Sequence, residues 1–396
     1  MNGTGKSSIL DASAIMLSWL ANRIKHAGAS GRPIAESDIK NGESSANLTI
    51  QLCDEGTYFG WNLVKVRKGY SKKDLASVLI SASETAKGIQ AGITEHNGKV
   101  NIPLFAYYPV NRAVLDIPLR IREKHQFGLL SAYEESLTSG ANFRTFFEWF
   151  REREDLENEN RKYQDDLIKP EGFEFPDPQL TAVRRALEIF MPDFQNLTVR
   201  RQPLRMEVTK KGQRLTVNQL SDGEKCLMAM VGDLARRMAI ANPERKDPLL
   251  GDGIVMIDEI DLHLHPKWQR LVVPSLRAVF PNCQFFISTH SPHVITHVKP
   301  EKLFILNMKD PGELEVVRPS ESYGKTADRV LEDLMGLETT RPNQVENALR
   351  AIYGQIDDGD LDTAREGIAE LERDIGEDPE LVKAKVLIKR KELIGR

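Results

Sequence analysis

An apolar run that ends in two adjacent carboxylates constrains this chain more than any other feature of its sequence. In the segment GIVMIDEIDLHLHP, residues 253–266, four apolar residues lead directly into Asp258 and Glu259. A short continuous apolar run of this kind is typical of a strand buried on both faces. Two ionised carboxylates at the end of such a strand are costly unless a cation lies nearby. We therefore expect Asp258 to ligate Mg²⁺ and Glu259 to orient an attacking water; an ordinary strand that ends in acidic residues is the alternative.

The first residues of the chain have the composition of a phosphate-binding loop. Glycines let backbone N–H groups turn inward around phosphates, a lysine reaches the β- and γ-phosphates, and a hydroxyl binds Mg²⁺. Lys6 and Ser7 supply the last two groups, and the helix expected to follow adds the dipole of its N-terminus. The predicted ATP-binding set is Asn2, Gly3, Thr4, Gly5, Lys6, Ser7 and Ser8. A glycine-rich turn without a ligand is the alternative.

The pattern of this loop is incomplete. In G-x-x-x-x-G-K-[ST] the first glycine would fall one position before Met1, and the strand that normally leads into the loop is absent from the sequence. This indicates a misplaced start or a truncation. We therefore expect this chain to bind ATP weakly, and micromolar binding of ATP would contradict that expectation.

A second apolar strand lies in FFISTHSPH, residues 285–293, and ends in Ser288, Thr289 and His290. A histidine at this place can reach the γ-phosphate of ATP and sense its hydrolysis. A histidine after a strand is often only structural, but the position of His290 downstream of the acidic pair favours the sensing role.

A fourth motif, LSDGEK at residues 220–225, begins an apolar helix that we expect to continue to Met238. The Ser221 hydroxyl and the Gly223 amide at a helix N-terminus form an anion-binding site. The alternative is a plain capping box, because Ser221 and Glu224 match S-x-x-E.

Composition restricts the class of protein further. The chain has 396 residues and a net charge of −4, which argues against a basic surface made for nucleic acid over the whole molecule. The cysteines Cys53, Cys226 and Cys283 are too scattered for a disulfide framework or a zinc site, which favours a reduced, cytoplasmic setting. Apolar stretches of about 18 residues, which a membrane span requires, are absent, so we expect no membrane contact.

The pattern of apolar residues predicts an α/β protein with a parallel sheet. The expected elements are a β-hairpin or meander at 46–68, a buried strand at 101–108, a charged helix at 142–164, strands at 197–208 and 215–217, and a helical hairpin at 345–395 that breaks near 376–379. The expected domain parts are 1–110, the first part of the ATPase domain; 111–195, a helical insertion; 196–325, the second part; and 326–396, a helical region for docking a partner.

The order of the four motifs resembles that of the ABC ATPase superfamily, and the resemblance covers nearly the whole chain. It implies an ABC-type P-loop ATPase fold with a mixed, mainly parallel sheet, a helical insertion and a C-terminal helical hairpin. It also implies a head-to-tail homodimer or higher oligomer, in which Ser221 and Gly223 act in trans on ATP held by the partner. The implied roles are phosphate and Mg²⁺ binding for Lys6 and Ser7, metal support for Asp258, catalysis as a base for Glu259, and γ-phosphate sensing for His290.

The sequence departs from the superfamily pattern in two places. Asp222 stands where the signature usually has its second glycine, as in many members that are not transporters. The glutamine of the family's Q-loop has no clear match, and Asn111 is a weak candidate for its place.

Two further segments resemble the PtuA-type ATPases of Septu and retron anti-phage systems. They are YYPVNRAVLDIPLRIREKH at 107–125 and GANFRTFFEWFREREDLENEN at 140–160, and the helical C-terminus is also similar. The resemblance implies an HNH nuclease as partner. In a retron it also implies a reverse transcriptase with its branched RNA–DNA product, msDNA, so that nucleic acid is reached through the complex.

The sequence also bears on four alternative interpretations. A DNA-clamping repair ATPase would need a basic stripe, for which the available pairs are Arg184 and Arg185, Arg200 and Arg201, and Lys210 and Lys211. A scaffold that binds ATP without turnover is disfavoured by the intact acidic pair. A nuclease or zinc site of the chain's own is disfavoured too, because the acidic residues at 358–360 suit a turn between helices and the histidines of DLHLHP follow the acidic pair.

Overall fold

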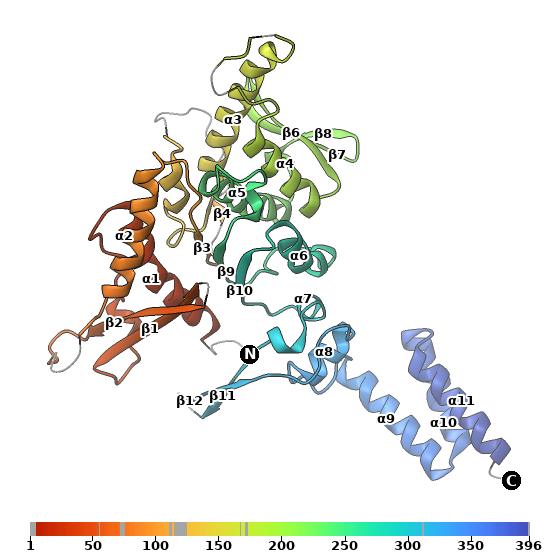
Figure 1. Cartoon of the computed structure of the whole chain (residues 1–396). Helices are drawn as coiled ribbons and strands as arrows, with labels where there is room; N and C mark the ends of the chain where they lie inside the picture. The colour runs from red at the N-terminus through yellow and green to blue at the C-terminus, as the bar shows by residue number, and fades with distance from the viewer. Residues whose placement is uncertain are drawn as a thin grey trace. The chain divides into compact units, whose positions relative to one another are not determined.

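The computed structural model describes residues 5–54, 56–71, 76–110, 113–114, 125–166, 168–170, 173–310 and 313–394. The chain divides into two compact units, Met1–Arg318 and Pro319–Arg396. Figure 1 shows both units, and each is described by itself below.

A parallel sheet of three strands organises unit 1. Its order is β10–β9–β3, with the bounds Cys283–Ile287 for β10, Gly253–Ile257 for β9 and Leu104–Tyr108 for β3. In both pairings Ile257 lies at the carboxyl end, opposite Ile287 of β10 and Tyr108 of β3. The loops that follow all three strands therefore leave from the same edge of the sheet.

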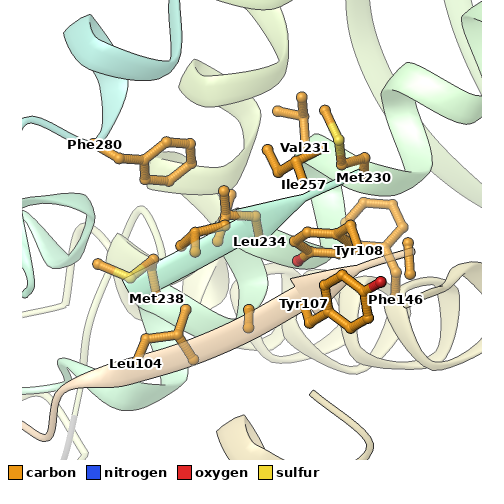
Figure 2. Close-up of a cluster of buried hydrophobic side chains, with 14 of the residues drawn as sticks. Leu104, Tyr107, Tyr108, Phe146, Met230, Val231, Leu234, Met238, Ile257 and Phe280 are labelled. Atoms are coloured by element: carbon orange, nitrogen blue, oxygen red, sulfur yellow. The ribbon is translucent and has the colours of Figure 1, made fainter. Parts of the chain in front are cut away.

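One helix, α5 (Asp222–Ala241), forms the centre of the core. Almost all its residues from Leu227 onward are buried, as expected of a helix that is covered on every side. Figure 2 shows its side chains Met230, Val231, Leu234 and Met238 packed with residues of the sheet. Phe146 also packs against this cluster. Two atoms of its ring lie 2.9 Å from where a Cβ on Gly232 would stand.

An antiparallel hairpin and two helices lie together in unit 1. The hairpin joins β1 (Ser45–Asp54) to β2 (Thr57–Val66), and the helices are α1 (Lys6–Lys25) and α2 (Ile80–Glu95). The buried indole of Trp61 in β2 donates a hydrogen bond to the carbonyl of Met16 in α1, at 3.2 Å.

The arm of unit 1 consists of α3 (Phe143–Asn160), α4 (Pro178–Phe190) and an antiparallel sheet. The strands of this sheet are β6 (Phe194–Arg201), β7 (Leu204–Lys210) and β8 (Gln213–Thr216), in that order. Side chains cap both helices, since Asn142 accepts from the N–H of Thr145 and Asp177 from that of Leu180. Figure 1 shows the two helices beside this sheet.

The remaining elements of unit 1 are short or peripheral. They are β4 (Ala113–Val114), β5 (Ala141–Asn142), α6 (Pro266–Val279), α7 (Pro292–Ile295), β11 (Ile305–Asp310) and β12 (Glu313–Val317). None of the helices in the described part of the chain is long and apolar enough to cross a membrane.

Unit 2 is helical and has its own apolar core. Its helices are α8 (Ala327–Asp333), α9 (Asn343–Asp358), α10 (Leu361–Ile375) and α11 (Pro379–Ile394). The core residues are Leu349, Ile352, Ile356, Ala364, Ile368, Leu371, Leu381, Ala384 and Ile388. Gly359 ends α9 in the left-handed conformation at φ 84°, and Asp360 caps α10 by accepting from the N–H of Thr363.

The fold class expected from the sequence is confirmed: the molecule is α/β, with a parallel sheet and many helices. The antiparallel strands form separate small sheets beside the parallel one. The helical hairpin expected at 345–395 contains three helices, because the chain breaks at Gly359 as well as near 376–379. The four domain parts expected from the sequence stay predictions.

Candidate nucleotide-binding and catalytic site

The acidic pair stands at the carboxyl edge of the parallel sheet. The Asp258 N–H donates to the carbonyl of Tyr108 at 2.9 Å, which continues the ladder one residue beyond β9. The Asp258 side chain is buried, with 2% of the residue exposed, and its carboxylate accepts a hydrogen bond from the Ser288 hydroxyl. Ser288 thus fixes the orientation of the first acid of the pair.

Glu259 adopts an unusual backbone conformation. Its φ is 46°, in the left-handed region that residues other than glycine rarely adopt. The Glu259 N–H donates to the Ser288 hydroxyl at 2.8 Å, and the next N–H donates to the Ser288 carbonyl at 3.1 Å. The turn therefore separates the two carboxylates, leaving Asp258 buried and Glu259 half-buried.

Lys6 meets this acidic pair from the other end of the sequence. Gly5, at φ 79°, precedes the first turn of α1, which holds Lys6 half-buried and the Ser7 and Ser8 side chains exposed. Burial lowers the pKa of Lys6, while the charges of Glu259 and Asp258 act to raise it. Because the two carboxylates act on the pKa of Lys6, the three charged groups lie near one another in space, although Lys6 is far from Asp258 and Glu259 along the chain.

His290 belongs to the same site. Burial and the positive charge of Lys6 lower its pKa, while Asp261 and Glu259 act to raise it. Its backbone N–H donates to the Asp261 carboxylate at 3.3 Å, and the Thr289 hydroxyl donates to the same oxygen at 2.5 Å. A neutral imidazole near Lys6 can donate its ring N–H to a phosphate oxygen.

The signature residues lie at the start of α5. Ser221 and Glu224 form a reciprocal capping box, and Lys210 of β7 donates to the Glu224 carboxylate. Gly223 lies so close to the loop after the acidic pair that a Cβ would stand 2.2 Å from the carbonyl oxygen of His263. The structure thus bears out the capping box, and the anion site at Ser221 and Gly223 stays a prediction.

The site residues expected from the sequence fall into three groups. The structure brings Lys6 together with Asp258, Glu259 and His290. Ser221 instead contacts Glu224, and Gly223 lies against the loop at His263. Asn2, Gly3, Thr4 and Asn111 lie outside the described residues, so their roles and the weak binding of ATP stay predictions.

Sequence reasoning missed the residues that position this site. Ser288 and Asp261 bind the acidic turn and the turn of His290 through side-chain hydrogen bonds. Gln269 of α6 joins them, donating to the carbonyls of Asp261 and Leu264 and accepting from the Ser291 hydroxyl. The polar residues that directly follow β9 and β10 were the signal in the sequence that could have indicated these positioning residues. Which of them hydrogen-bond to each other, however, depends on how the loops after the two strands fold.

Other polar residues have structural partners. His265 caps α6 by accepting from the N–H of Lys267 at 3.2 Å. Of the basic pairs weighed for DNA binding, five residues form ion pairs; these are Arg184 with Glu157, Arg185 with Asp247, Arg200 with Glu207, Arg201 with Glu154, and Lys210 with Glu224. These pairs do not form the bare basic stripe of a DNA clamp.

The chemistry of the donor set fits Mg²⁺. A buried carboxylate and an exposed serine hydroxyl are oxygen ligands, which Mg²⁺ prefers, and it usually keeps waters and phosphate oxygens as well. Among the described residues no group of three or more His, Cys, Asp and Glu side chains could hold a metal by itself. Asp258 and Ser7 therefore suit an ion that arrives with a phosphate ligand.

Comparisons with known proteins identify the family of the chain. Residues 112–296 match the family model described as "AAA domain, putative AbiEii toxin, Type IV TA system". "Retron Vc95 probable ATPase" of Vibrio cholerae serotype O1 biovar El Tor is 33% identical over 376 residues, covering 83% of this chain and 72% of that protein. "Retron Ec83 probable ATPase" of Escherichia coli is 31% identical over 407 residues, covering 90% of this chain and 74% of that protein.

Two further comparisons are more limited. "Septu protein PtuA" of Bacillus thuringiensis is 32% identical over 111 residues, which cover 27% of this chain and 28% of that protein. The SMC head domain from Thermotoga maritima aligns with 81% of this chain and 88% of its own length, at 14% identity and a TM-score of 0.38, too distant to assign anything. On the two long matches, the chain belongs to the family of retron ATPases.

Proposed function

We propose that this chain is the ATP-binding and ATP-hydrolysing switch subunit of a bacterial anti-phage defence complex. The observation that carries the proposal is the meeting of Lys6 with Asp258, Glu259 and His290 at the carboxyl edge of the parallel sheet. A cation, two carboxylates and an imidazole of lowered pKa at the start of a helix are the groups that phosphoryl transfer to water requires.

Each residue has a proposed role. Lys6 and the amides at the start of α1 bind phosphate, and Asp258 and Ser7 hold Mg²⁺, which would neutralise charge on the phosphates. Glu259 orients and deprotonates the attacking water, and His290 contacts the γ-phosphate. Ser288 and Asp261 are positioning residues, since they act through the acidic turn and the His290 turn.

The active form is proposed to be a homodimer or higher oligomer. Ser221 and Gly223 lie at the capped start of α5. They are proposed to close on ATP held by a second copy. ATP then shifts the population towards the closed assembly, to the extent that it binds that state more tightly than the open one.

The relatives support a role in a defence complex with further subunits. Their names place them in retron and Septu systems. We propose that the ATPase controls an associated HNH nuclease through residues 326–396, and that in a retron a reverse transcriptase and its msDNA belong to the same cytoplasmic complex.

Glu259→Gln tests the catalytic proposal. The amide cannot accept a proton from water, so ATP hydrolysis should fall by about 10²- to 10⁴-fold while an ATP-dependent dimer accumulates on size-exclusion chromatography. Glu244→Gln, at an exposed acid away from the site, is the matched control. Unchanged turnover in Glu259→Gln would remove Glu259 from the mechanism, and no ATP-dependent dimer would favour a scaffold that binds ATP without turnover.

Co-purification tests the partner proposal. The protein, expressed with its neighbouring genes and isolated with and without ATP, should carry a nuclease, or a nuclease and a reverse transcriptase. Isolation alone, together with salt-dependent binding to plain duplex DNA, would instead support the DNA-clamping ATPase.

A further inference from the structure

The arm of unit 1 contains two adjoining hollows, which are lined by residues other than the acidic pair. The hollows, of about 300 Å³ and 430 Å³, lie against α3, α4, β6 and β7. They share lining residues that include Arg161, Arg184, Asn196 and Thr198, so we treat them as one arm pocket. None of its lining residues belongs to the proposed ATP site.

The larger half of the arm pocket is rich in arginine. Five arginines and three glutamates line it. The glutamates hold guanidinium groups in place, with Arg184 donating to Glu157 at 2.8 Å and Arg200 to Glu207 at 3.1 Å. A guanidinium has five N–H donors, so these pairs leave donors over for an anion.

Two of the five arginines are not tightly held by acids. Among the described residues Arg161 forms no ion pair, and its guanidinium lies 5.6 Å from the centre of the Phe175 ring. Arg214 is 66% exposed at its side chain and lies 3.9 Å from Glu207. The larger half therefore carries an excess of positive charge that suits a phosphate group.

The smaller half of the arm pocket has both apolar and polar lining residues. Its apolar lining includes Leu187, Met191, Phe194 and Met228, all of them buried. Gln195, Asn196 and Thr198 line it too. An apolar lining with amides and a hydroxyl suits a planar ring that also hydrogen-bonds, as a nucleobase does.

The strand that carries Gln195, Asn196 and Thr198 is irregular. The pairing of β6 with β7 shifts register between Gln195 and Thr198, and Asn196 has φ 53°, in the left-handed region. A bulge redirects side chains out of the regular alternation of a strand and is common beside binding sites. Here two neighbouring residues with amide side chains, Gln195 and Asn196, line one hollow.

We propose that the arm pocket binds a nucleotide unit at a second site, separate from that for ATP, with the phosphate on the arginines and the base in the apolar half. The nucleotide unit is either free or part of a single strand of nucleic acid, since the chemistry recognised is the same. The proposal does not rest on the proposed ATPase role.

Binding is measured by fluorescence anisotropy on the full chain, with a labelled hexathymidylate and with thymidine 5′-monophosphate as competitor. The chain carries Lys6→Ala throughout, so that the proposed ATP site cannot account for binding. Displacement of the hexamer by the mononucleotide at a similar concentration would identify a free nucleotide as the ligand; binding of the hexamer alone would identify a single strand.

The double variant Arg161→Ala, Arg214→Ala should weaken binding at least about tenfold, because each removed guanidinium withdraws charge-assisted donors. Arg185→Ala is the matched control, since Arg185 stands next to Arg184 on α4 but pairs with Asp247 outside the pocket, and it should change affinity less than about twofold. Circular dichroism checks that each variant is folded.

Asn196→Gly separates base recognition from charge. Glycine adopts φ 53° without strain, so the change removes the amide alone and should weaken binding about fivefold. Absence of binding by both probes would overturn the proposal, as would binding that neither the double variant nor Asn196→Gly changes. An inactive ATPase would leave this result untouched, because every measurement is made without ATP turnover.

Discussion

At the scale of single residues, a buried charged network stabilises the middle of α5. Asp233 is fully buried and accepts hydrogen bonds from Arg236 at 2.7 Å, Arg237 at 2.7 Å and the Tyr108 hydroxyl at 3.0 Å. Arg237 also donates to the carbonyls of Ala132 and Glu134. The network joins α5 to Tyr108, the last residue of β3, at the carboxyl edge of the parallel sheet.

Asp233→Asn should lower the free energy of unfolding by about 3–5 kcal/mol, because it leaves two buried guanidinium groups without a countercharge. Tyr108→Phe removes one hydrogen bond from the same network and should cost about 1 kcal/mol. Urea titrations of both variants measure the difference. A loss under about 1 kcal/mol in Asp233→Asn would show that water or a rearranged partner compensates the arginines.

Gly223 is fixed by the close approach of two backbones. A Cβ at this position would stand 2.2 Å from the His263 carbonyl oxygen, so Gly223→Ala should displace the start of α5 and cost about 1–3 kcal/mol. Gly88→Ala in α2 is the control, because its Cβ would meet nothing within 4 Å and alanine favours a helix. The midpoint temperature of thermal unfolding should therefore be lower for Gly223→Ala than for the original chain, and equal or higher for Gly88→Ala.

At the scale of elements, the strands were the most predictable part of the molecule. The apolar runs before Asp258 and Ser288 correspond to β9 and β10. Covering on both faces explains the run of β9, whereas β10 alternates between half-buried and exposed residues. Asp360, read as a turn and cap residue, caps α10. Local sequence suffices for such features because their cause is local.

The assembly of the site was less predictable from local sequence. That Lys6 lies beside the acidic pair could be predicted only from the resemblance to ABC ATPases, because the order of strands in a sheet depends on contacts between distant parts of the chain. The positioning residues Asp261 and Gln269 could not be found, because their hydrogen bonds depend on the positive φ at Glu259 and on where α6 packs. The expected hairpin has its break near 376–379, where α10 ends and α11 begins, and the structure adds a second break at Gly359, between α9 and α10.

The start of α5 should be sensitive to acid. Burial raises the pKa of Glu224, but hydrogen bonds from Lys210 and Ser221 outweigh it and hold that pKa below the usual value. A carboxyl whose pKa is lowered in the folded state stabilises the fold above its unfolded pKa, and this stabilisation is lost as the pH falls through the folded value. The free energy of unfolding should therefore decrease as the pH falls below the ordinary glutamate value of 4.5.

Glu224→Gln removes this contribution, so its unfolding free energy, measured by urea titration at successive pH values, should depend less steeply on pH in that window. Glu244→Gln, at an exposed acid, should follow the original chain. Equal slopes for Glu224→Gln and the original chain would show that the Lys210 contact does not persist in solution.

At the scale of the whole molecule, the two units have separate apolar cores. The cluster around α5 belongs to unit 1, and the cluster of α9, α10 and α11 belongs to unit 2. A unit with its own core contains most of the burial that stabilises it, whereas a segment that shares a core unfolds when its neighbour is removed. This division lets an ATPase unit and a proposed docking unit change independently.

A fragment of residues 319–396 should therefore fold by itself into a helical domain with a cooperative thermal transition, followed by circular dichroism. Ile368→Ala in this fragment should cost about 2–5 kcal/mol, because it opens a cavity in a small core. Val386→Ala is the matched control on α11; its side chain is 59% exposed, so the change should stay within about 0.5 kcal/mol. A fragment without helical signal, or one in which both variants behave alike, would show that unit 2 depends on unit 1 for its fold and that the division does not hold in solution.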